Sequence, residues 1–186
     1  MSESTPSGPA ASGGIRNAEL LGVYVNDHLA AATGGVELVS RMLSRHSGTP
    51  YEPKLEQLLD ELREERSAHV AMAGALGVPV RSYKQLGTWV AEKVSRAKLN
   101  GRLFSRSPLS DLVEFEFIAT AVLAKRAGFE TLLELAAVDP RLDRGELERL
   151  VAQADDQHKW LADARREVAA RVFGGRPQAA DDAADT

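Results

Sequence analysis

The amino-acid sequence predicts an all-α protein, an antiparallel four-helix bundle with an extra short crossover helix. Apolar residues recur at spacings of three and four along the body of the chain and never persistently at two, which is the pattern of helices with one buried face. Capping residues, glycines and prolines divide this pattern into four long segments and one short segment. Short links between long helices favour neighbours that run in opposite directions.

The first two helices are expected over about residues 17–46 and 53–76. The turn-forming sequence SGTP at 47–50 separates them. The second helix is expected to end at Gly77, with Pro79 just beyond it, because glycine accepts a left-handed cap and proline cannot continue a helix.

A shorter helix is expected over 82–99, as a crossover element packed on one end or side of the bundle. Ser82 and Gln85 have the spacing of a capping box at its start. The pair Asn100-Gly101 supplies the stop signal.

The last two long helices have clear start signals. One begins near Pro108, because proline is favoured in the first turn, and we expect Gly128 to kink or break it before 129–138. The other is expected over 143–173, opening at Asp143 as the N-cap.

The flanking segments are expected to be disordered. Residues 1–14 are small, polar and rich in proline and glycine, and residues 174–186 form an acidic tail without periodicity. Neither segment can bury enough apolar area to offset the entropy of ordering. We therefore expect one folded domain over 15–173.

Composition excludes several classes of function. The 186 residues carry a net charge of −4, so the chain as a whole is no nucleic-acid-binding polycation. The absence of cysteine excludes thiolate nucleophiles, disulfides, zinc fingers and cysteine-ligated iron–sulfur clusters. No apolar run approaches the ~18 residues of a membrane span, so we expect no membrane partner. We also expect a cytoplasmic, bacterial protein. Carboxylates, hydroxyls and four histidines remain for chemistry.

The segment 81–106 is the only candidate surface for nucleic acid. It holds seven lysines and arginines and one glutamate, with Trp89 among them. A solvated basic face that balances the acidic helix at 52–65 explains this excess, and Trp89 has the neighbours of a packing anchor. We therefore expect no nucleic-acid partner.

Ionisable residues interrupt the apolar stripes of all four long helices, where the helical period demands apolar side chains. Aligning the predicted helices places these residues near one layer at mid-bundle, with His28 level with His69 and Glu116 level with Val25. Buried carboxylates and imidazoles are costly unless they are paired or bound to metal. The residues expected to point inward are His28, Glu65, His69, Glu116, Asp155 and His158.

Two further features of the first helix concern its packing. The pair Gly34-Gly35 lies beside alanines, which predicts either close approach of a neighbouring helix or a cavity next to His28. His46, at the end of the helix, is expected to be peripheral, since an imidazolium suits the helix dipole there.

The inward-facing residues on these long helices resemble the ferritin-like superfamily. The residues that carry the resemblance are the sequence ERSAH at 65–69, Glu116, and DDQH at 155–158. Di-iron members of that superfamily take one glutamate from each of two helices and Glu-x-x-His from each of the other two.

The resemblance implies a metal site. Its ligands would be Glu65, His69, Glu116, Asp155, His158 and His28, with Tyr24 nearby. Iron or manganese would be the metal, and oxygen or peroxide handling the chemistry. The chain departs from the superfamily pattern in three ways. Glu65 and His69 are four residues apart rather than three, Asp155 replaces glutamate, and His28 stands where a glutamate is expected.

Two functions stay open. We favour a non-enzymatic binding or protein-interaction module whose polar layer is structural, for example with His28 paired to Glu116 and His69 to Glu65. The alternative is a di-metal carboxylate oxidoreductase or metal-handling protein that uses iron or manganese. A second copy of the chain is a candidate partner, because bundles of this kind can associate through a side face.

Overall fold

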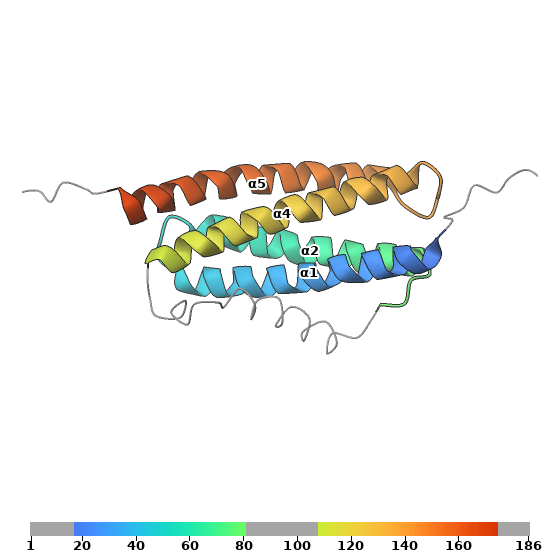
Figure 1. Ribbon diagram of the computed structural model, residues 1–186, viewed down its shortest axis with the longest axis horizontal. Coiled ribbons are helices and arrows are strands. Elements are labelled where there is room, and N and C mark those ends of the chain that lie inside the picture. The colour runs from blue at the N-terminus through green and yellow to red at the C-terminus, as the bar shows by residue number, and fades with distance from the viewer. Residues whose placement is uncertain (1–16, 81–107, 175–186) are drawn as a thin grey trace, which may run out of the picture.

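The computed structural model describes residues 17–80 and 108–174, and these residues form helices and no strands. The helices lie side by side around a common core (Figure 1). The all-α prediction is therefore confirmed. The helices are α1 (Ala18–Arg45), α2 (Glu52–Ala75), α4 (Pro108–Ala136) and α5 (Arg144–Phe173). In these ranges no helix combines the length and the apolar character that crossing a membrane requires.

The helix ends follow from local signals in the sequence. The side chains of Asn17 and Asp143 each accept a hydrogen bond from a backbone N–H of the first turn, at 3.2 and 3.1 Å. Gly48 and Gly77 adopt φ of 74° and 71° in the turns after α1 and α2, a region that favours glycine. The predicted bounds of α1, α2 and α5 agree with the structure to within one residue.

Neighbouring helices run in opposite directions. Along the contact of α1 with α4, Arg45 pairs with Glu114 near the start of α4, while His28 lies against Gly128 far along it. Further contacts show the same opposed order for the other neighbouring pairs. These contacts are Thr33–Arg66 and His28–His69 between α1 and α2, Tyr51–Arg171 and Glu65–Gln157 between α2 and α5, and Glu116–Arg165 and Arg126–Asp155 between α4 and α5.

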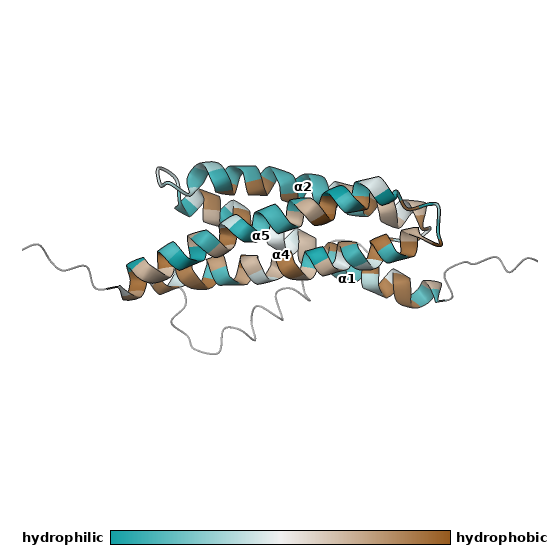
Figure 2. Ribbon diagram, turned by 90° about the horizontal axis from the view of Figure 1, so that it is seen from above, coloured by the Kyte–Doolittle hydropathy of each residue, from teal (hydrophilic) through white to brown (hydrophobic). Residues whose placement is uncertain are grey.

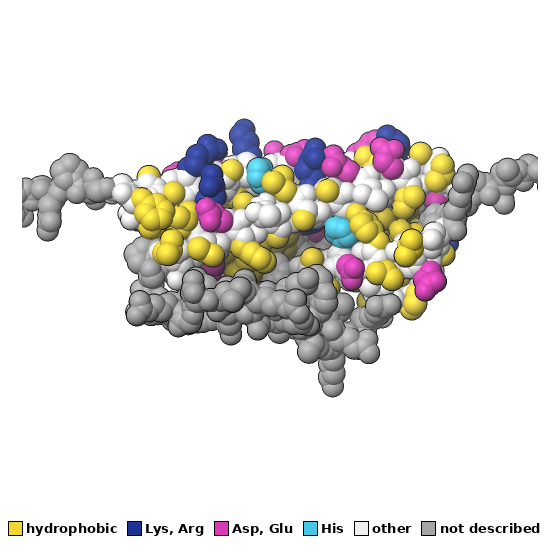
Figure 3. Space-filling model, in the orientation of Figure 1, with side chains coloured by type: hydrophobic (Ala, Val, Ile, Leu, Met, Phe, Trp, Pro, Cys, Tyr) yellow, Lys and Arg dark blue, Asp and Glu magenta, His cyan; other side chains and the backbone are white. Residues whose placement is uncertain are grey.

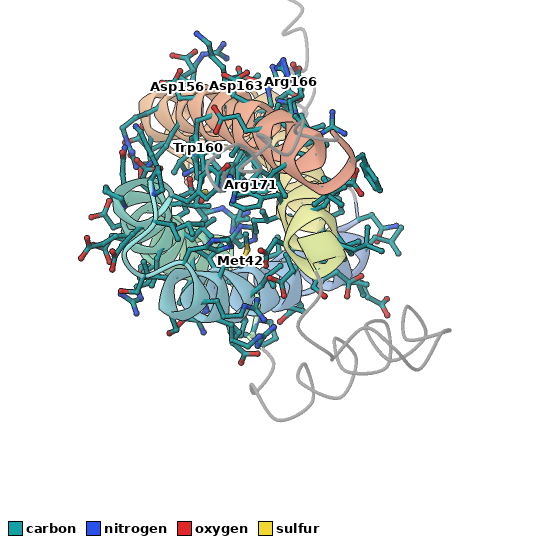
Figure 4. All side chains as sticks on the ribbon, turned by 90° about the vertical axis from the view of Figure 1, so that its left-hand side faces the viewer. Met42, Asp156, Trp160, Asp163, Arg166 and Arg171 are labelled. Carbon is teal, nitrogen blue, oxygen red and sulfur yellow. The ribbon has the colours of Figure 1, made fainter. Side chains whose placement is uncertain are left out.

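The helices α2 and α4 run in the same direction and lie diagonally opposite each other in the end-on view (Figure 4). Glu65 contacts Lys125, and His69, one turn further along α2, lies beside Phe129, one turn further along α4. The end of α2 and the start of α4 therefore lie at opposite ends of the bundle, as Figure 1 shows.

The hydrophobic core consists of two clusters, one toward each end of the bundle, and a polar layer lies between them. Met42, Leu58 and Phe115 belong to the cluster at the end of α1. Leu29, Phe129 and Leu147 belong to the cluster at the start of α1. Trp160 points toward the interior, whereas Asp156, Asp163 and Arg166 point outward from α5 (Figure 4). The outer faces of α2 and α5 are mostly hydrophilic (Figure 2).

The structure corrects the prediction for Gly128 and tests half of the prediction for the pair Gly34-Gly35. Gly128 does not break its helix, because α4 is continuous from Pro108 to Ala136. At Gly35, no described atom lies within 4 Å of the position that a Cβ would take, so no described helix approaches closely at that residue, and the prediction for Gly34 stays a prediction. The predicted crossover helix at 82–99, the basic segment 81–106, the 1–14 arm and nearly all of the 174–186 tail lie outside the described residues.

Gly128 makes room for an imidazole. A Cβ built on Gly128 would lie 2.6 Å from Cε1 and 2.7 Å from Nδ1 of His28, closer than real Cβ atoms come. The helical glycine is therefore explained by the close approach of the His28 ring from α1, although alanine is a better helix former.

We predict that Gly128→Ala destabilises the protein by about 1–3 kcal/mol in urea unfolding, because the new methyl group clashes with His28. Gly35→Ala is the matched control. It adds a methyl group in open space and should stabilise the protein by up to about 1 kcal/mol. In a His28→Ala background, Gly128→Ala should become neutral or stabilising. Equal effects of Gly128→Ala in the two backgrounds would contradict this explanation.

Candidate functional site

A buried network of polar side chains joins three helices at mid-bundle. Glu65 of α2 is 3% exposed, and Gln157 of α5 is 1% exposed. The ammonium of Lys125, from α4, donates hydrogen bonds to Glu65 Oε2 and Gln157 Oε1. Gln157 Nε2 donates to Glu65 Oε1 at 2.9 Å and to Glu61 Oε2 at 2.8 Å. We refer to Glu61, Glu65, Lys125 and Gln157 as the polar layer.

Burial and charge act in opposite directions on the two central groups of the polar layer. Burial raises the pKa of Glu65, while the charge of Lys125 and the hydrogen bonds from Lys125 and Gln157 lower it. Burial also lowers the pKa of Lys125, and the Glu65 carboxylate opposes that shift. The interior excludes water, which would otherwise solvate the two charges. The pair is stable there because each group is the counter-charge of the other.

A pair of histidines lies next to the polar layer, toward the start of α1. The rings of His28 and His69 are stacked with centroids 6.2 Å apart, and Tyr24 lies against His28 at 4.6 Å. Phe129 of α4 lies beside His69, at 6.1 Å. His69 is buried, and its Nε2 atom has no hydrogen-bond partner among residues 17–80 and 108–174.

The surroundings of the two histidines disfavour their charged forms. Burial lowers the pKa of His69 from 6.5 to about 4, the charge of His28 acts in the same direction, and a backbone hydrogen bond with Val25 opposes both. Burial also lowers the pKa of His28, against the nearby charge of Asp27. Both rings are therefore neutral at pH 7.

The structure brings together only part of the predicted set. Glu65, His69 and His28 lie close together at mid-bundle, as predicted. Glu116 and Asp155 are exposed instead of inward-facing, and His158 is half-buried. Among residues 17–80 and 108–174, no group of three or more histidines, aspartates and glutamates is placed to hold a metal ion.

The level predicted for Glu116 along the bundle was wrong because of the direction of its helix. The prediction aligned the start of the first long helix, at 17, with that of the third, at 108, whereas α1 and α4 run in opposite directions. Glu116 therefore lies near the end of α1 rather than level with Val25. It pairs with Arg165 at 3.5 Å, not with His28.

Asp155 is displaced around its helix. The buried residues next to it are Ala154 and Gln157, so Asp155 falls on the flank of α5. It accepts a hydrogen bond from Arg126 Nε of α4 at 2.5 Å.

Sequence reasoning missed two members of the polar layer that carried a signal. Gln157 lies three residues after Ala154 and four before Leu161, both of which are buried. Lys125 lies three residues after Val122 and four before Phe129, which are also buried. Both therefore occupy stripe positions, where a polar side chain indicates a buried network.

His46 is buried, which corrects the prediction that it is peripheral. Its ring packs against Tyr51 at 5.6 Å and against Phe115 at 5.5 Å. Its Nε2 atom lies 4.0 Å from Asp111 Oδ1 and lacks a hydrogen-bond partner within the described part of the chain. His46 therefore belongs to the aromatic core at the end of α1, away from the polar layer.

The chain matches no protein-family model, no curated protein and no solved structure with which it was compared. The structure supports a four-helix all-α bundle, and the ferritin-like resemblance stays a prediction.

We predict that acid weakens the fold through His69. Between pH 6.5 and about pH 4 the unfolded chain binds a proton at this residue and the folded chain does not. The free energy of unfolding should therefore fall as the pH is lowered through this window, by up to about 1.4 kcal/mol per pH unit. Urea unfolding at several pH values measures this slope. His69→Gln, which cannot titrate, should flatten the slope, and an unchanged slope in that variant would refute the assignment.

Proposed function

We propose that the chain is a non-enzymatic helical-bundle module that binds partners through its outer surface, while the polar layer holds the helices in register. One observation carries this proposal. Both carboxylate oxygens of Glu65 are engaged by groups of the same chain, Oε2 by Lys125 and Oε1 by Gln157. The positive charge that a buried carboxylate needs is thus supplied from within.

The other carboxylates of the predicted metal set support the same proposal. Glu116 pairs with Arg165, and Asp155 pairs with Arg126, both on the outside of the bundle. The alternative, a di-metal centre with iron or manganese, requires these two side chains to leave their arginines and converge with Glu65. It also requires Lys125 to withdraw from Glu65, because a lysine ammonium and a metal ion would compete for the same oxygens.

We predict that Lys125→Met destabilises the protein by about 3–5 kcal/mol at pH 7, because it leaves the Glu65 carboxylate buried without its charged partner. Urea unfolding followed by circular dichroism measures the loss. Lys159→Met removes an exposed lysine of α5 and is the matched control, with an expected change within about 0.5 kcal/mol.

The double variant Glu65→Met with Lys125→Met tests the same point in the other direction. It removes both charges and should recover much of the lost stability, because apolar side chains of similar volume can replace a buried ion pair. If Lys125→Met behaved like the Lys159→Met control, the polar layer would not hold the bundle together and this part of the proposal would be wrong.

We predict that the protein purified without chelators and then incubated with iron or manganese retains far less than one ion per chain. Elemental analysis measures the content, for the wild type and for His69→Ala and His158→Ala. Two ions per chain in the wild type that disappear in both variants would overturn the proposal and support the di-metal alternative.

A further inference from the structure

The helix α4 presents an uncharged seam on its outer side. Its residues are spaced alternately by four and three, which is the spacing of the contact seam in paired helices that wind around each other. All of them are exposed. The α4 seam consists of Val113, Phe117, Thr120, Ala124, Ala127 and Thr131. On the face shown in Figure 3, hydrophobic side chains gather over α4, and charged side chains lie mainly over α5.

The two hydroxyl groups of the α4 seam already donate hydrogen bonds within the helix. Thr120 Oγ1 donates to the backbone carbonyl of Glu116 at 2.9 Å, and Thr131 Oγ1 donates to that of Ala127 at 2.9 Å. Because both hydroxyl groups are bonded to their own helix, the threonines can present methyl groups to a partner. A dry, apolar contact therefore leaves nothing unsatisfied here.

The charged residues beside the seam already have partners within the chain. Glu114 pairs with Arg45, and Glu116 pairs with Arg165. On the other half of the helix, Arg126 pairs with Glu130 at 2.9 Å and with Asp155. The rim of the seam is thus neutralised, which favours an uncharged partner surface over nucleic acid or a strongly charged peptide.

The size of the seam residues changes along the helix. The first half carries the large side chains Val113 and Phe117, and the second half carries Ala124 and Ala127. A second helix with the same sequence that runs in the opposite direction would place Phe117 over the second copy's Ala124, and Val113 over its Ala127. A parallel copy would instead set large residues against large ones and leave a gap between the alanines.

We propose that a second copy of this chain packs on the α4 seam in the antiparallel direction, with the two-fold axis of the dimer near Thr120. The seam is complementary to itself about that axis, which is the requirement for a symmetric dimer interface. One helix pair is small beside the ~800 Å² that each partner contributes to a standard interface, so association should be reversible and depend on concentration. This inference does not depend on the role of the polar layer, since the seam lies on the opposite side of α4.

The first test is the mass of the full-length protein by light scattering over a range of concentrations. We expect the wild type to approach twice the 20.1 kDa of one chain as concentration rises. Ala124→Glu places an unpaired charge in the seam and should remain monomeric. Ala71→Glu, on the exposed side of α2, is the matched control and should behave as the wild type does.

The second test determines the direction of packing by disulfide formation between single cysteine variants. The natural chain has no cysteine, so the introduced residue is the only thiol of each copy. Under oxidising conditions Thr120→Cys should give a covalent dimer, since residue 120 lies beside its own copy near the axis. Thr131→Cys should give none, because in the antiparallel dimer its two copies are about 33 Å apart, at ~1.5 Å per residue of helix.

Three results would overturn the inference. The first is the mass of a single chain at every concentration, which would leave the seam to another occupant such as residues 81–107 or a different protein. The second is a dimer that persists in Ala124→Glu. The third is a covalent dimer from Thr131→Cys as efficient as that from Thr120→Cys, which would indicate parallel packing. Unchanged circular dichroism of each variant confirms that it is folded.

Discussion

The bundle depends on one buried charge, the carboxylate of Glu65. Removing an ionised carboxylate from water costs several kcal/mol unless a counter-charge and hydrogen bonds replace the solvent. Lys125 supplies the charge from α4 and Gln157 the further hydrogen bond from α5, so three helices have to meet at one level. A shift of α2 or α4 by one turn would leave a charge unpaired in the core, and a shift of α5 would leave buried hydrogen-bonding groups unsatisfied. On the function proposed above, the polar layer selects one register of these helices, whereas the apolar clusters on either side would tolerate several.

The remaining helix, α1, is positioned by shape and by neutral contacts. The His28 ring occupies the space that Gly128 leaves on α4 and stacks on His69 of α2. Thr33 accepts a hydrogen bond from Arg66 Nε at 3.0 Å one turn further along. Because both imidazoles are neutral at pH 7, this part of the interior needs no counter-charge. Electrostatics thus set the register of α2, α4 and α5, and steric fit sets that of α1.

The sequence predicts the helices better than the site, for physical reasons. Asn17 and Asp143 act locally, so helix ends can be found without the fold. Glu65 and His69 interrupt a clear leucine stripe on α2, which made their burial predictable. The helix α4 is apolar on both sides, so its period does not identify the inner face, and Glu116 was assigned to it wrongly. To predict that Lys125 contacts Glu65 and Gln157, one has to know the relative direction and level of three helices. The apolar pattern of a single helix does not contain this information.

The two-sided apolar character of α4 also bears on where the protein acts. A helix that packs against its neighbours with one face needs apolar residues on that face alone. On α4, the inner face already holds Phe115, Ile118 and Val122. Phe117 on the outer face stays 56% exposed, and the exposed part of a phenylalanine costs free energy in water until something covers it. The interior, in contrast, has its central charges paired within the chain. The surplus of apolar surface therefore lies outside the bundle, and it is there that binding to another molecule would lower the free energy of the protein.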